Sequence, residues 1–170
     1  MDETKWLISR EIPRLRRYAL ALVGDPTEAD DLVQDCLERA IRKRHLWKRR
    51  GSLRSWLYRI QYNIFLNQST RRNRIRRQKP WEQAAAGMSE PAAQEGQIVY
   101  RDVAMAMREL PAEQRAAIVL TAIEGLPYDE AADILGIPIG TLRSRLSRGR
   151  ERLRSLYVTP DGRASLRRVK

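Results

Sequence analysis

Apolar residues recur at every third or fourth position along most of the chain, a spacing typical of amphipathic α-helices. Positions 24–26, Gly-Asp-Pro, interrupt the first apolar stripe, and Thr27 is the expected N-cap of the next helix, with Asp30 three residues further on. The positions expected to face the core in these two helices are Ile12, Leu15, Ala19, Leu22 and Val23, then Ala29, Leu32, Val33, Cys36, Leu37, Ala40 and Ile41. Strand-like alternation is absent from the sequence, so the predicted fold class is all-α.

The second half of the chain has the pattern of a helix-turn-helix. One helix is expected from about position 110 to Glu124, where Gly125 ends it, and a second helix from Tyr128 to Leu135. Gly136 then permits the left-handed backbone conformation that a tight turn needs before a third helix.

The third helix sorts its side chains into distinct faces when it is projected at about 100° per residue. The packing face is predicted to hold Leu142, Leu146, Gly149 and Leu153. The opposite half, which can enter a groove, holds Arg143, Ser144, Ser147, Arg148 and Glu151. Three further arginines flank the apolar stripe and are better placed for phosphates than for base edges: Arg145, Arg150 and Arg152.

The formal net charge of +12 on 170 residues indicates a polyanionic partner. The third helix concentrates this charge, with six arginines against the single acid Glu151 between positions 141 and 154. Such a helix lies along a phosphate-lined groove at little electrostatic cost, so we expect it to bind DNA; the alternative is an arginine-rich solvated face. Between positions 102 and 133, in contrast, seven acids stand against two arginines. This acidic part is expected either to face away from the DNA or to contact a protein.

Charge and helix-breaking residues also divide the chain into regions. Residues 1–78 carry 19 basic and 9 acidic side chains, whereas residues 100–157 carry 9 basic and 8 acidic ones. Residues 79–99 are rich in Ala, Gly, Gln and Glu, contain several Pro and Gly, and are predicted to form a flexible linker. The tail, residues 158–170, is basic. The expected organisation is therefore two small helical domains joined by a linker.

Several classes of function are not favoured. The uninterrupted apolar stretches, such as 116–120, are far shorter than the roughly 20 residues of a membrane-spanning helix. The first residues lack the basic start and apolar run of a secretory signal, so a cytoplasmic location is expected. Cys36 and His45 are the only residues of their kinds, which argues against a disulfide, a metal site or another cofactor. No nucleophile motif or Gly-rich phosphate loop is present, so no catalytic activity is expected.

Two sequence blocks resemble the extracytoplasmic-function (ECF) sigma factors, the two-domain class of sigma-70-type initiation factors of bacterial RNA polymerase. The first block contains DPTEADDLVQDCLERA and GSLRSWLYRIQYN, and the second contains LPAEQRAAIVL and EGLPYDEAADILGIPIGTLRSRLSRGRERLR. Together they cover about residues 25–78 and 105–156. The resemblance implies a stress-response factor that binds core polymerase, recognises the −35 and −10 promoter elements and opens the DNA.

The resemblance also implies a role for each matching region. Binding to the polymerase is implied for Asp30, Asp31, Leu32, Gln34 and Asp35. Recognition of the −10 element is implied for Arg49, Arg50, Arg54, Trp56, Arg59, Asn63, Asn67, Arg71 and Arg72. Recognition of the −35 element is implied for Thr141, Arg143, Ser144, Arg145, Ser147, Arg148, Arg150 and Arg152. Trp56 is explained equally well as a core residue, because it lies at helical spacing from other apolar residues.

The partners that the resemblance implies are core polymerase, promoter DNA and an anti-sigma factor. On the polymerase, they are the clamp of the largest subunit and the flap of the second subunit. Physically, the acidic polar face of residues 30–38 suits a basic protein surface and not DNA, although an ordinary solvated face is the alternative. Two other functions stay open. A helix-turn-helix repressor or activator would bind a palindrome as a dimer, and a sigma mimic would titrate an anti-sigma protein.

Overall fold

The computed structural model describes residues 3–47, 52–78 and 105–157, and within them the side chains other than those of 72–78 and 157. Every regular element in these ranges is helical, which confirms the predicted all-α class. The expected linker, 79–99, and the basic tail, 158–170, lie outside the described residues.

The first half of the chain forms a bundle of three helices. These are α1 (Glu3–Val23), α2 (Pro26–Arg42) and α3 (Leu53–Gln78), with a short 3-10 turn, η1 (Arg44–Leu46), after α2. The rings of Tyr18 and Tyr58 pack with their centroids 4.6 Å apart, and the buried amide of Gln61 donates a hydrogen bond to the Leu15 carbonyl at 3.0 Å. The predicted apolar stripes supply this core with two exceptions: Ile12 is only half-buried and outside it, and Ile41, in the last turn of α2, is 38% exposed.

The start of α2 differs from the prediction. The N-cap is Asp25, whose carboxylate accepts a hydrogen bond from the Glu28 backbone N–H at 2.9 Å, and Pro26 is the first residue of the helix. The prediction of Thr27 as the N-cap is therefore wrong. Proline suits the first helical position because its missing N–H and fixed φ cost nothing there, so the cap falls on the acid before it.

The second half begins again at residue 105 and forms the predicted helix-turn-helix. Helix α5 (Ala112–Ile118) continues into a π-helical turn, η2 (Val119–Ile123), and is followed by α6 (Tyr128–Leu135) and α7 (Ile139–Tyr157). Gly125 and Gly136 have φ values of +67° and +64°, in the left-handed region that glycine adopts without strain. The predicted bounds of α6 and the turn at Gly136 are both confirmed.

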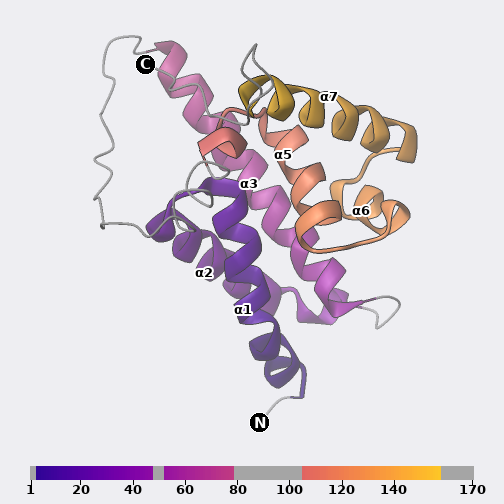
Figure 1. Cartoon of the computed structure of the whole chain (residues 1–170). Coiled ribbons are helices and arrows are strands. Elements are labelled where there is room, and N and C mark those ends of the chain that lie inside the picture. The colour runs from indigo at the N-terminus through magenta and orange to yellow at the C-terminus, as the bar shows by residue number, and fades with distance from the viewer. Residues whose placement is uncertain (1–2, 48–51, 79–104, 158–170) are drawn as a thin grey trace, which may run out of the picture.

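The two halves pack against each other around one continuous hydrophobic core. Helix α3 contacts α5 and α6, and α1 contacts α5 and η2. In Figure 1, α3 runs diagonally through the molecule, with α1 and α2 on one side and α5 and α6 on the other. The guanidinium of Arg108 also donates to the carbonyl of Gly24 at 2.6 Å, and Arg115 donates to the Leu22 carbonyl, so the second half holds the α1–α2 turn.

Candidate nucleic-acid interface

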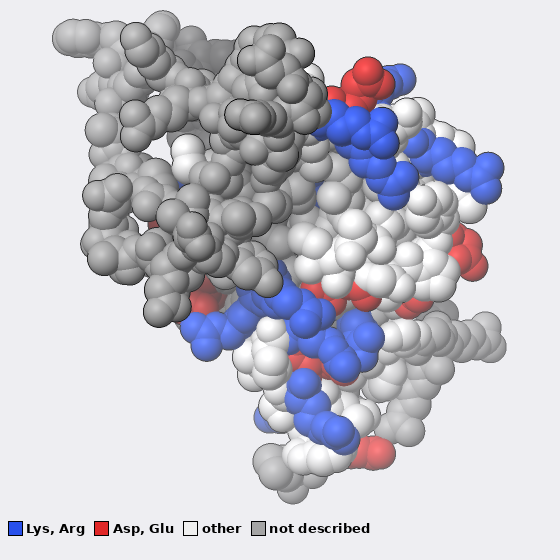
Figure 2. All heavy atoms as spheres, in the orientation of Figure 1, with Lys and Arg blue, Asp and Glu red and all other residues white. Residues whose placement is uncertain are grey.

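Helix α7 divides its two faces as predicted. Leu142 and Leu146 are buried, and a Cβ on the buried Gly149 would lie 2.8 Å from Ile118 Cδ1, so α7 packs very closely on α5. The outer face is open to solvent and holds Arg143, Ser147, Arg148 and Glu151 as exposed residues, with Thr141 and Ser144 half-buried at its start. Figure 2 shows Lys and Arg side chains standing out from the molecular surface over α7. This face therefore has the charge and the reach to enter a DNA groove.

Two of the three flanking arginines lie beside this outer face. Arg150 and Arg152 are exposed, and Arg150 donates a hydrogen bond to the Tyr128 hydroxyl at 3.3 Å. The hydroxyl of Tyr128, at the start of α6, thus helps to hold the Arg150 guanidinium at the edge of the groove-facing surface.

Arg145 is placed differently from its predicted role. It lies 3.9 Å from Glu113 and beside Tyr62 of α3, with its side chain about one-fifth exposed. Burial raises the pKa of the Tyr62 hydroxyl above its usual value, and the neighbouring Arg145 charge opposes part of that increase. Arg145 is therefore directed at the first half of the protein and not at the outer face of α7, because the two halves close over it.

Three of the four predicted −10 residues on the first part of α3 lie beside α6. Arg59 donates a hydrogen bond to the Asp133 carbonyl, and the exposed Asn63 lines a cavity of about 380 Å³ with residues 132–138. Trp56 is half-buried: it packs against the core and lines a second cavity of about 530 Å³. Arg54 binds Glu11 of α1, with 3.1 Å between Nε and Oε2. The structure thus brings these four residues together along one stretch of helix.

The rest of the predicted −10 set lies beyond that stretch. Asn67 and Arg71 are exposed towards the end of α3. Arg49 and Arg50 lie outside the described residues, as does the side chain of Arg72.

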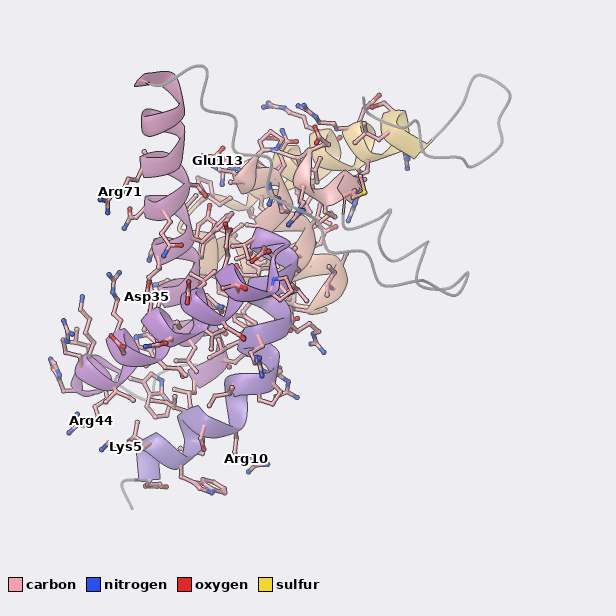
Figure 3. The ribbon with its side chains drawn as sticks, turned by 90° about the vertical axis from the view of Figure 1, so that its left-hand side faces the viewer. Lys5, Arg10, Asp35, Arg44, Arg71 and Glu113 are labelled. Carbon is pink, nitrogen blue, oxygen red and sulfur yellow. The ribbon has the colours of Figure 1, made fainter. Side chains whose placement is uncertain are left out.

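The predicted polymerase-binding residues all lie on α2, and all but one are exposed. Asp30, Asp31, Gln34 and Asp35 are exposed, and the Asp30 carboxylate forms two hydrogen bonds of 2.9 Å with Arg16. Gln68 of α3 donates to Asp35 at 3.2 Å. In Figure 3, Asp35, Arg44 and Arg71 lie on the same side of the molecule, on α2, η1 and α3.

The exception is Leu32, which is 0% exposed. The prediction that it touches the polymerase is corrected, because its side chain fills the core beneath the acidic face of α2. By packing in the core, Leu32 instead orients α2 so that its acidic residues are on the solvent side.

A buried carboxylate that the sequence did not single out joins the two halves. Glu124, at the end of η2, accepts two hydrogen bonds of 2.8 Å from the Arg17 guanidinium and one of 2.5 Å from the Tyr58 hydroxyl. Its side chain is 2% exposed. Burial alone raises the pKa of Glu124, but the hydrogen bonds from Arg17 and Tyr58 and the charges of Arg17 and Arg54 outweigh it, so the net pKa is lowered. The only signal in the sequence was the acidic excess of residues 102–133.

Other kinds of site find little support in the part of the chain that is described. None of its His, Cys, Asp and Glu residues forms a group of three that could hold a metal ion. Burial raises the pKa of the Cys36 thiol to about 12, so this thiol stays protonated at neutral pH. Among the described helices, none is both long and apolar enough to cross a membrane.

Comparison with known proteins agrees with this arrangement. Residues 8–61 match the family model described as the Sigma2 domain of PhyR, and residues 100–153 match that described as Sigma-70, region 4. The chain is 34% identical over 148 residues to the ECF RNA polymerase sigma factor EcfG of Rhodopseudomonas palustris, across 86% of this chain and 81% of that protein. It is 36% identical over 155 residues to the ECF RNA polymerase sigma factor SigE of Mycolicibacterium smegmatis, across 87% of this chain and 59% of that protein.

A solved structure extends the similarity to the fold. The sigma factor RpoE from Bartonella quintana, in complex with the anti-sigma factor NepR, is 34% identical with a TM-score of 0.78, and the match covers 91% of this chain and 96% of that one. Sequence and fold therefore agree over both halves, and the chain belongs to the ECF sigma factors, which direct promoter-specific transcription initiation by bacterial RNA polymerase.

Proposed function

We propose that the two halves of this sigma factor recognise two promoter elements in two different forms of DNA. The observation that carries the proposal is the outer face of α7, where Arg143, Ser147 and Arg148 are exposed directly behind the turn at Gly136. Arginine forks pair with guanine edges in the major groove, and serine hydroxyls accept or donate to several bases. This face suits the −35 element as duplex, with Arg150 and Arg152 on the adjoining phosphates.

The −10 element is bound as a single strand along α3. The amide of Asn63 can pair with a base edge, Trp56 offers a ring face to a base, and Arg59 and Arg71 suit phosphates. An unpaired base exposes edges that a duplex hides, so capture of flipped bases favours the open form of the promoter. No hydrolysis is needed for such capture. The protein acts as an initiation factor in the cytoplasm and not as an enzyme.

Core polymerase binds the acidic face of α2, the exposed residues Asp31, Gln34 and Asp35. In a chain of net charge +12, this surface repels DNA and attracts a basic protein surface, which in this family is the clamp of the largest subunit. The flap of the second subunit would hold the C-terminal half near the −35 element.

Transcription in vitro tests the proposal directly. Purified protein and core polymerase are incubated with a library of genomic fragments, and the transcript starts are mapped. Start sites that share two upstream elements at a fixed spacing are expected, and Arg143→Ala and Arg148→Ala should weaken use of the −35 element by about tenfold or more each. If the protein instead shifts duplex DNA as a dimer and gives no promoter-specific transcript, the proposal is wrong.

An anti-sigma factor is the expected regulator. The RpoE relative was solved with the anti-sigma factor NepR, and a free chain of this charge needs a means of avoiding non-specific DNA. We expect an anti-sigma protein of the NepR type to form a stable complex with this chain and to prevent transcription in the assay above.

The match of residues 8–61 to the Sigma2 domain of PhyR favours one alternative function. In that alternative the chain is a sigma mimic that titrates an anti-sigma protein. The double variant Asn63→Ala with Arg148→Ala separates the two functions. Promoter output that is unchanged by this variant would favour the mimic, whereas a loss of output supports the sigma factor.

A further inference from the structure

The contact between the halves covers the first part of α3 and leaves the outer face of α7 open. Helix α6 lies on α3 at Ser55, Arg59 and Asn63, whereas Arg143 and Arg148 remain exposed on α7. The two surfaces to which the proposed function assigns DNA binding thus differ in the state of their hydrogen-bond donors. In this conformation a duplex has access to exposed arginines on α7, whereas a single strand on the first part of α3 would meet Ser55 and Arg59 already bonded to α6.

The α6 atoms that bind α3 are hydrogen-bond acceptor oxygens, as are the phosphate oxygens of a DNA backbone. Ser55 donates to the Glu130 carboxylate and Arg59 donates to the Asp133 carbonyl. Asp129, Glu130 and Asp133 together line the cavity of about 530 Å³ whose other wall includes Trp56. Carboxylate and carbonyl oxygens occupy the hydrogen-bond donors that phosphate oxygens would otherwise engage.

The Glu124 carboxylate gives this contact its strongest polar link. It lies 107 residues from Arg17 in sequence, and its side chain is 2% exposed. A buried carboxylate with three charge-assisted or short hydrogen bonds is costly to leave without partners, so separation of the halves requires Glu124 to be rehydrated.

We propose that α6 is an intramolecular competitor for the −10 strand, held over α3 by the Arg17–Glu124–Tyr58 contact, so that the free protein binds duplex −35 DNA but not single-stranded −10 DNA until its halves separate. The proposal rests on the proposed function for the identity of the two DNA ligands. It adds which half blocks which ligand and which residues hold the block. The apparent dissociation constant for the strand is then the intrinsic one divided by the fraction of open molecules.

A reversible crosslink tests the competition. Ser55→Cys with Glu130→Cys is treated with a bis-maleimide that contains a cleavable disulfide spacer; the native thiol, Cys36, is buried with a raised pKa and does not react. The probes are a fluorescein-labelled −35 duplex and a −10 non-template strand taken from the transcription assay, plus a random-sequence single strand. Ser55→Cys alone, treated with the same reagent, controls for modification of the groove.

The crosslinked protein should bind the duplex within about twofold of the untreated protein and bind both single strands at least about tenfold more weakly. Reduction of the spacer should restore strand binding. Equal strand binding before and after reduction would overturn the proposal, as would a failure of the crosslink to form, because the halves would then not be packed together in solution. An absence of promoter-specific transcripts, with the crosslink still blocking the random strand, would instead count against the proposed function alone.

Charge reversal supplies a second measurement without a crosslink. Glu124→Lys should increase the affinity of the free protein for the single strands several-fold, and Arg17→Glu combined with Glu124→Arg should return it towards wild type. Asp31→Lys, the same reversal of charge at an exposed acid away from this contact, is the matched control for net charge and should leave the affinity for the single strands unchanged. Equal affinities in Glu124→Lys and Asp31→Lys would contradict the role given to Glu124.

Discussion

Two acidic sites of this strongly basic chain differ in their access to water: the acidic face of α2 is exposed, and the carboxylate of Glu124 is buried. On α2 the carboxylates of Asp31 and Asp35 are exposed, and even the paired Asp30 and Arg16 have side chains that are 56% and 60% exposed. At the end of η2, Glu124 is buried and receives hydrogen bonds from Arg17 and Tyr58. The carboxylates on α2 are thus available to a binding partner, whereas the carboxylate of Glu124 is already bound within the protein. Burial and the supply of donors decide between the two.

The largest difference between the surfaces should appear on charge reversal. Glu124→Lys places a cation beside Arg17 in a site with little access to water, and we expect the free energy of unfolding in urea to fall by about 2–3 kcal/mol. This is less than the roughly 3–5 kcal/mol lost when a fully buried pair is broken, because Arg17 stays largely in solvent. Asp31→Lys should change it by no more than about 0.5 kcal/mol. An equal loss in the free energy of unfolding for Glu124→Lys and Asp31→Lys would show that the two sites do not differ in this way.

Binding to core polymerase should show the opposite order. Asp31→Lys and Asp35→Lys reverse exposed charges on the α2 face and should each weaken binding to core polymerase about tenfold, a loss of about 1.4 kcal/mol. Glu109→Lys, in the other half, should bind as wild type in the same fluorescence titration. If all three variants bind alike, the α2 face is not the polymerase surface.

Acid should lower the free energy of unfolding through the protonation of one buried carboxylate, that of Glu124. The pKa of Glu124 is lowered in the folded protein, since hydrogen bonds from Arg17 and Tyr58 outweigh the opposing effect of burial. Its contribution to stability is therefore complete above the ordinary glutamate pKa of about 4.3 and is lost as the pH falls through the lowered folded value. Urea unfolding measured from neutral to acidic pH should show a steeper loss for wild type than for Glu124→Gln. Parallel profiles would contradict this assignment.

The smallest effect is expected at the exposed ion pair. Asp30→Ala removes the contact with Arg16 and should lower the free energy of unfolding by less than about 1 kcal/mol. The difference from wild type should vanish in about 1 M salt, because screening there acts over about 3 Å. A larger, salt-independent loss would mean that the α2 surface is stabilised in the same way as Glu124.

Local pattern was sufficient for much of this molecule. The bounds of α6, the left-handed Gly136 and the packing face of α7 all follow from the helical period and from what glycine permits, and the structure has each of them. The predicted N-cap Thr27 was wrong because Pro26 suits the first helical position, which leaves Asp25, the residue before it, as the cap.

Other features depend on segments that are distant in sequence. Arg145 was expected beside phosphates, yet it lies beside Tyr62 and Glu113. A helical projection gives only the direction of a side chain around the helix axis, and it carries no information about which other helix packs against that side. The Glu124 contact is of the same kind, since its partners Arg17 and Tyr58 come from the other half. The acidic excess of residues 102–133 predicts a surface that faces away from the DNA or contacts a protein, but it does not predict that two of these acids, Glu124 and Glu130, bind the chain's own first half.

The π-helical turn at Val119–Ile123 accommodates one residue more than an α-helical turn, and the Glu124 N–H closes it by donating to the Val119 carbonyl at 2.9 Å. Each residue of a helix is turned by about 100° from the one before, so a single added residue rotates everything after it by about that angle. The extra residue of the π-helical turn therefore determines the direction in which the Glu124 side chain points. Where a homologous sequence is one residue shorter at this position, its acid would point to another side of the helix, and a gap in an alignment would mark where two lineages join their halves differently.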